Sequence, residues 1–388
     1  MKIRIEGTGP VALATALWMV RAGVPARQIA LPLEEPAMSI LPDEAPRRAL
    51  ALSEGSRQML ARLIDMPPSG RIDTVEIFQA GRSGHTRIQR SDFPLPALGW
   101  VIVWEELIAQ LHEAARGHAF ARPDDAGFAT PDLRVHAGGM PPPARRNAQD
   151  FDVRDSGQAG LLFEVQVTST QQTAFECFRP CGPLALLPAP AVSGADHGAR
   201  YTVVWCDTLD ASRQRATLTP EALGAELKAA LRATLGPRHW HLHAPCFAPL
   251  SVVTPAVAVP LPRVARRETV GLGEVWIGNA AQALHPVAGQ GLNLGLRDAF
   301  TLARCLGDAW ARGQTAPLPS GLLVDEALEH YQQARRRDRT LTIQGTDLLA
   351  HSFAWPAASR IQSALLGAMH VSPALRMPLA RALVFGHR

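Results

Sequence analysis

The chain has 388 residues, 47% of them hydrophobic, which is enough to bury a large core and to form two or three domains. Its net charge of +4 comes from scattered basic residues, which argues against a nucleic-acid-binding stripe. Five cysteines form no CxxC pair, so we expect neither a metal site nor a disulfide scaffold. No apolar run reaches the roughly 18 residues of a membrane-spanning helix, and we expect a folded protein of the reducing cytoplasm.

The N-terminal segment predicts a strand, a glycine turn and a helix. Residues 2–6 alternate in polarity, GTGPVA follows, and residues 12–21 have helical character. This order is the layout of a dinucleotide-binding fingerprint, in which the turn approaches the nucleotide and the last small residue allows close packing of helix on strand. The candidate nucleotide-binding residues here are Gly7, Gly9, Pro10 and Ala12. A tight turn without a ligand is the alternative.

The second predicted strand, residues 28–31, ends without the acidic residue that usually holds the ribose hydroxyls in such folds. Pro32 and Leu33 occupy that place. Glu34 or Glu35 would substitute only if the proline turned the chain back. This departure predicts a weaker hold on the adenosine end of a cofactor.

The middle of the chain is predicted to be rich in strands. Strand character is found at residues 74–88, 100–104, 161–167, 175–178 and 201–206, and helices are expected at 105–116 and from Thr219 onward. We interpret residues 161–260 as a mixed or antiparallel sheet whose inner face forms a substrate pocket.

Three histidines alternate at His239, His241 and His243, which predicts a strand with imidazoles on one face. Such a strand could bind a metal ion, but no carboxylates stand nearby to orient the rings. We therefore favour a packed or solvated strand and expect no metal.

A second glycine-rich stretch, residues 278–299, follows a predicted strand at 274–277 and leads into a helix from about Gln290. A helix start presents free backbone N–H groups, and Gly289 and Gly291 would let an anionic or carbonyl-bearing cofactor approach them. His285 is a candidate for chemistry or, equally, for a structural turn. An ordinary strand-to-helix turn is the alternative for the whole stretch.

The C-terminal region predicts helices at 325–353, 358–371 and 374–385. Apolar residues recur on one face at Ile361, Leu365, Leu366 and Met369, and several arginines stand among them. Such a face is typical of helix packing, and a membrane surface is the other possibility.

The stretch Gly278-Asn279-Ala280-Ala281 and the loop after it resemble the second flavin-binding motif of the class A flavin monooxygenases with the para-hydroxybenzoate hydroxylase fold, most closely the ubiquinone-biosynthesis branch. Residues 182–188 and 203–206 resemble the same branch, and residues 335–339 resemble the C-terminal helix of the family. The resemblance implies an α/β fold: a Rossmann-like FAD-binding domain, a mixed/antiparallel β-sheet substrate domain and C-terminal helices. The implied FAD-binding domain spans 1–70, 101–160 and 268–312, the substrate domain 71–100 and 161–267, and the helical region 325–388.

By this resemblance the cofactor is FAD. The implied contacts are Arg48 on the flavin side, Asn279 at the ribityl or pyrophosphate end, and Pro286 near the ring. The residues that would meet the isoalloxazine, largely through backbone groups, are Gly289, Gly291, Leu292 and Asn293. Gly278 and Ala280 belong to the head of the same motif. No catalytic base is assigned.

One motif departs from the family pattern. In relatives an Ala-Asp-Gly motif touches the flavin pyrophosphate and in some the reduced nicotinamide, whereas Gly138 and Pro142 replace its Asp and Ser here. NAD(P)H as electron donor therefore stays open. With this motif and the ribose carboxylate both changed, we predict that residues 289–293 contribute more FAD affinity than residues 7–12.

The resemblance implies an FAD-dependent aromatic-ring hydroxylase, a monooxygenase that uses O2 on a ubiquinone precursor or similar lipophilic phenol. The alternative is a catalytically degenerate flavin-fold protein that serves as an accessory or scaffold subunit of quinone biosynthesis; a flavin oxidoreductase on a non-aromatic substrate is a weaker option. A peripheral contact with the inner membrane or with a quinone-biosynthesis complex is also implied, and no nucleic-acid partner.

Overall fold

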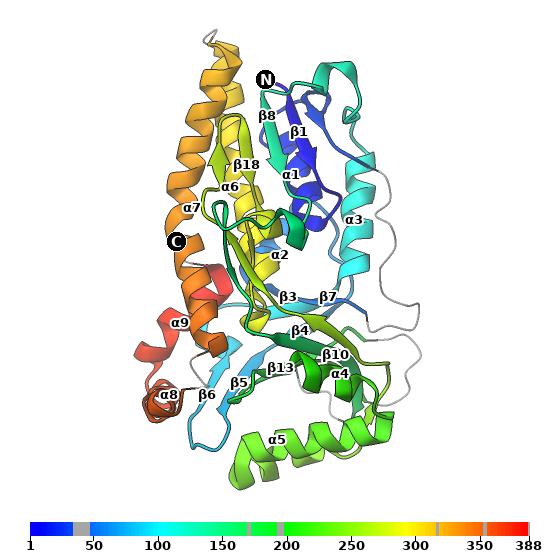
Figure 1. Ribbon diagram of the computed structural model, residues 1–388, viewed down its shortest axis with the longest axis vertical. Helices are drawn as coiled ribbons and strands as arrows, with labels where there is room; N and C mark the ends of the chain where they lie inside the picture. Colours follow the sequence, from blue (N-terminus) through cyan, green and yellow to red (C-terminus); the bar gives the residue numbers. More distant parts are fainter. Residues whose placement is uncertain (34–46, 169–171, 192–197, 316–317, 352–354, 387–388) are drawn as a thin grey trace.

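The computed structural model describes residues 1–33, 47–168, 172–191, 198–315, 318–351 and 355–386. A parallel sheet with its helices forms one half of the molecule, and a larger sheet forms the other (Figure 1). The long helix α7 (Ser320–His351) runs along one side of the first half. The expected α/β class is confirmed.

The first half is built on a five-stranded sheet of order β17-β18-β8-β1-β2. Neighbours from β18 to β2 are parallel, and β17 turns back antiparallel to β18. The strands are β1 (Ile3–Glu6), β2 (Ile29–Ala30), β8 (Leu133–His136), β17 (Val270–Gly271) and β18 (Glu274–Trp276). Three segments far apart in sequence thus place their strand ends, and the loops after them, at one edge of the sheet.

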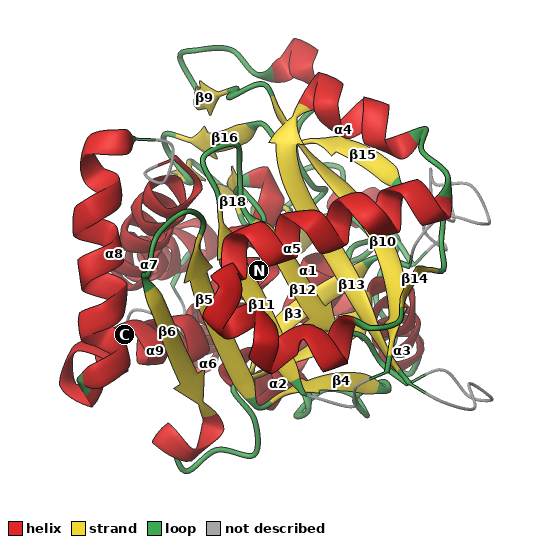
Figure 2. Cartoon of the chain, turned by 90° about the horizontal axis from the view of Figure 1, so that it is seen from below, coloured by secondary structure: helices red, strands yellow, loops and turns green. Residues whose placement is uncertain are grey.

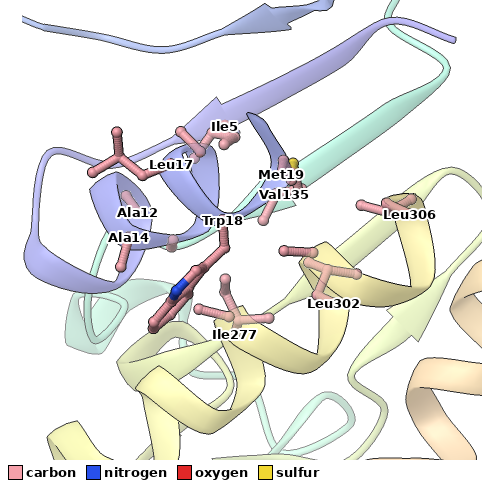
Figure 3. Packing of buried hydrophobic residues seen from close by; sticks show 14 of the residues in the cluster. Ile5, Ala12, Ala14, Leu17, Trp18, Met19, Val135, Ile277, Leu302 and Leu306 are labelled. Carbon is pink, nitrogen blue, oxygen red and sulfur yellow. The ribbon is translucent and has the colours of Figure 1, made fainter. Parts of the chain in front are cut away.

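Helices cover this sheet and make its core. Figure 3 shows Trp18 of α1 (Pro10–Arg21) beside Ile277 and Leu302 of α6 (Gln290–Thr315), and Leu17 belongs to the same buried cluster. Ala12 is fully buried in the same cluster. Its small side chain lets α1 lie close to the sheet, which is the packing role of the third small position in a nucleotide-binding turn.

The second half is an eight-stranded mixed sheet, in which β11 pairs parallel to β5 and the other pairs are antiparallel. Its strands are β5 (Thr74–Gln79), β6 (His85–Gln89), β10 (Gln158–Val167), β11 (Thr173–Phe178), β12 (Leu184–Pro188), β13 (Ala199–Thr208), β14 (Leu250–Val252) and β15 (Val257–Pro260). Helix α5 (Pro220–His243) crosses one face (Figure 2). Side chains alternate between α5 and the opposite face, as the strand period requires.

The strand predicted at residues 239–243 is wrong: these residues are the last turn of α5. Gly236, at φ +69°, breaks the helix, and Pro237 restarts it. Proline suits a first helical turn, where its missing N–H has no partner to lose. The alternating histidines therefore diverge, and His239 and His243, four apart, face Phe78 on the sheet.

Two small antiparallel sheets join the halves, one of order β3-β7-β4 and one of order β19-β16-β9. Their strands are β3 (Ala49–Ser53), β4 (Ser69–Ile72), β7 (Gly99–Val103), β9 (Phe151–Arg154), β16 (Arg263–Arg266) and β19 (Gln282–Ala283). The remaining helices are α2 (Glu54–Leu60), α3 (Trp104–Arg116), α4 (Leu209–Ala216), α8 (Pro356–Val371) and α9 (Pro373–Phe385). Strand β7 crosses the domain boundary expected at residue 100, and the domain boundaries stay a prediction.

Candidate active site

A cavity of about 820 Å³ lies where the two halves meet. Its walls come from the loop after β1, the loop after β8, strand β3, the start of α6, one face of the large sheet, and helices α7 to α9. Ligand sites of drug-sized molecules have volumes of about 300 to 1,000 Å³. The cavity has the size of a ligand site and connects the glycine-rich loops to the sheet predicted to bind substrate.

The N-terminal loop contributes one end of the cavity. Gly7, Gly9 and Pro10 line it, and Gly9 is the N-cap of α1, with no acidic side chain in the first helical turn. Gly7 has φ +129°, and a Cβ there would lie 2.5 Å from the carbonyl oxygen of Ala137. Glycine is thus required where this loop passes the loop after β8. The helix start, with its free N–H groups, faces the cavity as an anion site would.

The second glycine loop forms the adjoining wall. Gly289 has φ +59°, and a Cβ there would lie 2.8 Å from the Cβ of Ala51, so the loop lies directly on β3. Gly291 differs, because an added Cβ would meet no atom within 4 Å. Gly289 is required by packing, whereas Gly291 leaves open space in the cavity. A flat ring could approach the first turn of α6 there.

Asn293 holds this wall in place. Its side-chain oxygen accepts a hydrogen bond from the Ser53 amide at 2.9 Å, and its side-chain nitrogen donates to the carbonyls of Ala51 at 3.0 Å and Gly289 at 2.7 Å. The residue is 2% exposed. The amide group therefore joins β3 to the glycine loop and fixes the position of the loop beside the cavity.

A buried ionic network holds α6 against α7. Asp298 accepts hydrogen bonds from Arg335 of α7 at 2.8 Å and from Gln282 at 2.7 Å. Arg335 and Arg297 both pair with Asp338 at 2.7 Å. Burial opposes the charge on Arg335, but the two carboxylates outweigh it and raise its pKa. These pairs fix α6 against α7 in the motif that the sequence singled out.

Most of the predicted site residues line this one cavity. Those that do are Gly7, Gly9, Pro10, Arg48, Asn279, Pro286, Gly289, Gly291, Leu292 and Asn293. Three predicted residues lie behind its wall: Ala12, Gly278 and Ala280 are buried. A Cβ on Gly278 would approach Val11 of α1 to 3.2 Å, so this glycine brings the head of the motif against α1. The part of each residue in FAD binding stays a prediction.

Other candidates have different places. Arg48 lines the cavity with its guanidinium over the Trp104 ring, 5.2 Å from the centroid. His285 is buried, and its Nδ1 accepts a hydrogen bond from the Val287 amide, which fits the structural-turn interpretation. Pro32 follows the short strand β2, while Glu34 and Glu35 lie outside the described residues.

One face of the large sheet forms the other end of the cavity, and it is apolar except for one carboxylate. Ala174, Glu176 and Phe178 of β11 alternate toward the cavity, beside Val75 and Ile77 of β5, Ala185 and Leu187 of β12, and Val204 of β13. Burial raises the pKa of Glu176 to about 7. Sequence reasoning missed this residue, although a lone acid within TAFECF is a recognisable signal in a buried strand.

Three histidines form a separate cluster at β6, on the face of the sheet away from the cavity. The ring of His85 stands 4.4 Å from His239 and 4.7 Å from His370 of α8, and it bonds Glu76. Within the described part of the chain, no group of three or more His, Cys, Asp or Glu is placed to hold a metal ion.

The residues around the first end of the cavity fit a flavin nucleotide. Gly9, Gly139 and Gly291 line it, and a Cβ on any of them would meet nothing within 4 Å, so their missing side chains leave space for a ligand. Two helix starts, of α1 and α6, supply amides for phosphate and ring carbonyls. The changed motif residue Gly138 also lines the cavity.

Comparison with known proteins agrees with this geometry. Residues 152–338 match the family described as FAD binding domain. The chain is 27% identical to 3-demethoxyubiquinol 3-hydroxylase of Escherichia coli over 91% of this chain and 90% of that protein. It is 32% identical to ubiquinone hydroxylase UbiL of Rhodospirillum rubrum over 51% of this chain, but that alignment spans only 40% of the relative.

A solved structure shows the same fold. That of PqsL, a probable FAD-dependent monooxygenase from Pseudomonas aeruginosa, superposes with a TM-score of 0.66 at 17% identity and covers 95% of this chain and 99% of that one. The expected cofactor, FAD, is confirmed by the family match, and NAD(P)H stays open. Residues 152–338 thus match an FAD binding domain, and the chain as a whole is similar in sequence to a ubiquinone-type hydroxylase and in fold to a flavin monooxygenase.

Proposed function

We propose that this protein is an FAD-dependent aromatic-ring hydroxylase that acts on a lipophilic phenol such as a ubiquinone precursor. The observation that carries the proposal is one continuous cavity of about 820 Å³, which joins the glycine loops to an apolar sheet face. Two relatives named as ubiquinone hydroxylases or demethoxyubiquinol hydroxylases support the substrate class.

The glycine loops would hold the cofactor. Residues 7–10 and Asn279 lie where the pyrophosphate and ribityl chain would be held, and the first turn of α6 at Gly291 to Asn293 would meet the ring. Bound FAD supplies the oxygen chemistry, and O2 is the oxidant. The protein orients the ring and excludes water.

The substrate chamber would be formed by the sheet and the C-terminal helices. Leu366 of α8 and Leu379 and Leu383 of α9 close the cavity opposite the sheet. Apolar walls favour an aromatic ring with an alkyl substituent, because burying such a ligand removes apolar surface from water.

The purified protein tests this proposal. We expect a yellow protein with flavin absorption bands, a gain in thermal stability with added FAD, and O2 consumption that depends on a prenylated phenol and yields its hydroxylated product. A colourless protein that FAD does not stabilise would contradict it. Flavin binding with no O2 consumption on any phenol would favour the accessory or scaffold role instead.

We further propose that α8 and α9 meet a membrane surface, from which a lipophilic substrate would enter. Ile361 and Leu365 of α8 and Leu375 of α9 are 73%, 54% and 52% exposed, and exposed arginines at 360 and 381 could pair with anionic headgroups. No helix among the described residues combines the length and apolarity needed to span a bilayer. Co-sedimentation with anionic vesicles checks this. The double variant Ile361→Ser/Leu365→Ser should lose vesicle binding, and the control Leu318→Ser should keep it. Equal vesicle binding by the double variant and the control would contradict the membrane contact.

A further inference from the structure

Among the described residues that line the substrate chamber, one carboxylate, Glu176, stands at a defined position in the sheet. Ile77, Glu176, Ala185 and Val204 are consecutive partners across β5, β11, β12 and β13, and all four line the cavity. The acid is therefore flanked by apolar side chains on both sides. Ala185 is small, which leaves the space beside the carboxylate to a ligand.

The core beneath β11 does not use the side chain at position 176. The other face of β11 carries Phe175 and Cys177, which are fully buried under α5. Ala174 and Phe178, on the same face as Glu176, are apolar and fit the chamber. A half-buried carboxylate among apolar side chains, without a partner, is unfavourable, so its place here indicates a role toward a ligand.

Among the described residues, no charge of opposite sign pairs with Glu176. Its described neighbours on β5, β12 and β13 are apolar, and Arg48 is the other ionisable residue among the described lining residues. The thiols of Cys177 and Cys206, next to it in the sheet, have pKa values raised by burial, so they stay neutral. Burial alone raises the pKa of Glu176 to about 7, which leaves the acid able to exchange a proton near neutral pH.

We infer that Glu176 is a catalytic residue that binds the hydroxyl group of a phenolic substrate and accepts its proton during ring hydroxylation. The inference rests on the proposed function. The phenol O–H donates a hydrogen bond to the carboxylate. As the ring is oxidised, the O–H bond breaks, its electron pair stays on the ring oxygen and its proton moves to a carboxylate oxygen. The more electron-rich ring carbon forms a bond faster to the oxygen atom that O2 and reduced FAD would supply. The C–H bond at that carbon then breaks, its electron pair makes the ring aromatic again, and its proton joins the second oxygen atom of O2, which leaves as water. The proton held by Glu176 returns to the ring oxygen.

The binding test needs no turnover. Calorimetry would compare 2-methoxyphenol with its methyl ether, 1,2-dimethoxybenzene, on the FAD-loaded protein between about pH 5 and about pH 9. Because the charged acid accepts a stronger hydrogen bond, the affinity for the phenol should rise as pH passes about 7, the pKa of Glu176, and should exceed that for the ether by about tenfold above it. Glu176→Gln should lose the pH dependence and the preference, whereas Glu221→Gln, exposed on α5, should keep both.

The results separate this inference from the function on which it rests. A wild-type enzyme that hydroxylates phenols but binds phenol and ether equally at every pH would overturn the role of Glu176. So would a Glu176→Gln variant that keeps the phenol preference and the rise of phenol affinity with pH. Should the variant fail to fold, the pH dependence and ether comparison on the wild type still decide. Binding of neither ligand would overturn the phenolic substrate class itself.

Discussion

Replacing Asn293 with alanine should loosen the second glycine loop, which contains Gly289 and leads into α6. The side chain makes three hydrogen bonds, one with the amide of Ser53 and two with backbone carbonyls, at 2.7 to 3.0 Å in a site that is 2% exposed. Each lost bond costs about 1 kcal/mol, and we expect the free energy of unfolding of the apoprotein to fall by about 3 kcal/mol. Urea denaturation followed by fluorescence measures this.

The same change should weaken FAD binding, because β3 no longer holds the loop against which the ring would lie. A flavin fluorescence titration should show a loss of about tenfold or more, equivalent to about 1.4 kcal/mol. Asn279→Ala is the matched control, because Asn279 lies in the same motif and lines the same cavity but is exposed. This substitution should change the free energy of unfolding by no more than about 0.5 kcal/mol. The reasoning is refuted if both variants are equally stable.

Two further predictions test the site and its support. Gly291→Val should reduce FAD affinity at least about tenfold more than Gly9→Val. A Cβ fits at either position without protein contact, so each substitution would displace only the ligand. Equal or reversed losses of FAD affinity would contradict the larger contribution of residues 289–293. Arg335→Met removes the partner that buried Asp298 and Asp338 share, and urea denaturation should show a loss of about 3 to 5 kcal/mol in the free energy of unfolding. Arg336 is exposed on the same helix, so Arg336→Met should leave the free energy of unfolding nearly unchanged. Similar effects of the two substitutions would contradict the role of the network.

Local patterns in the sequence predicted much of the fold. The glycine turn at residues 7–12 lies between β1 and α1, and the stretch from 278 leads into α6, because strand alternation, glycine and helical spacing act within a few residues. The strand predicted at His239 to His243 was wrong because period-2 histidines were considered without the helix-restarting Pro237 just before them. A short pattern cannot reveal that a helix continues across a kink.

The cavity depended on contacts that no local pattern carries. Ten predicted residues from three segments converge on one cavity, and that Glu176 lies on the same cavity follows only from the register that places it beside Ala185. Likewise, the distinction between Gly289, required by β3, and Gly291, open to a ligand, follows from what lies opposite each. Motif spacing indicated that these glycines matter and gave no means to separate their roles.

The absorption spectrum and O2 consumption of the purified protein test the central claim most directly. We predict flavin bands in the protein as isolated or after FAD is added, and O2 uptake that begins only when a reductant and a lipophilic phenol are both present, with one hydroxyl group added to the ring. A protein that binds no flavin would contradict the account of the cavity. Flavin reduction and O2 uptake that are unaffected by any phenol would contradict the proposed hydroxylation.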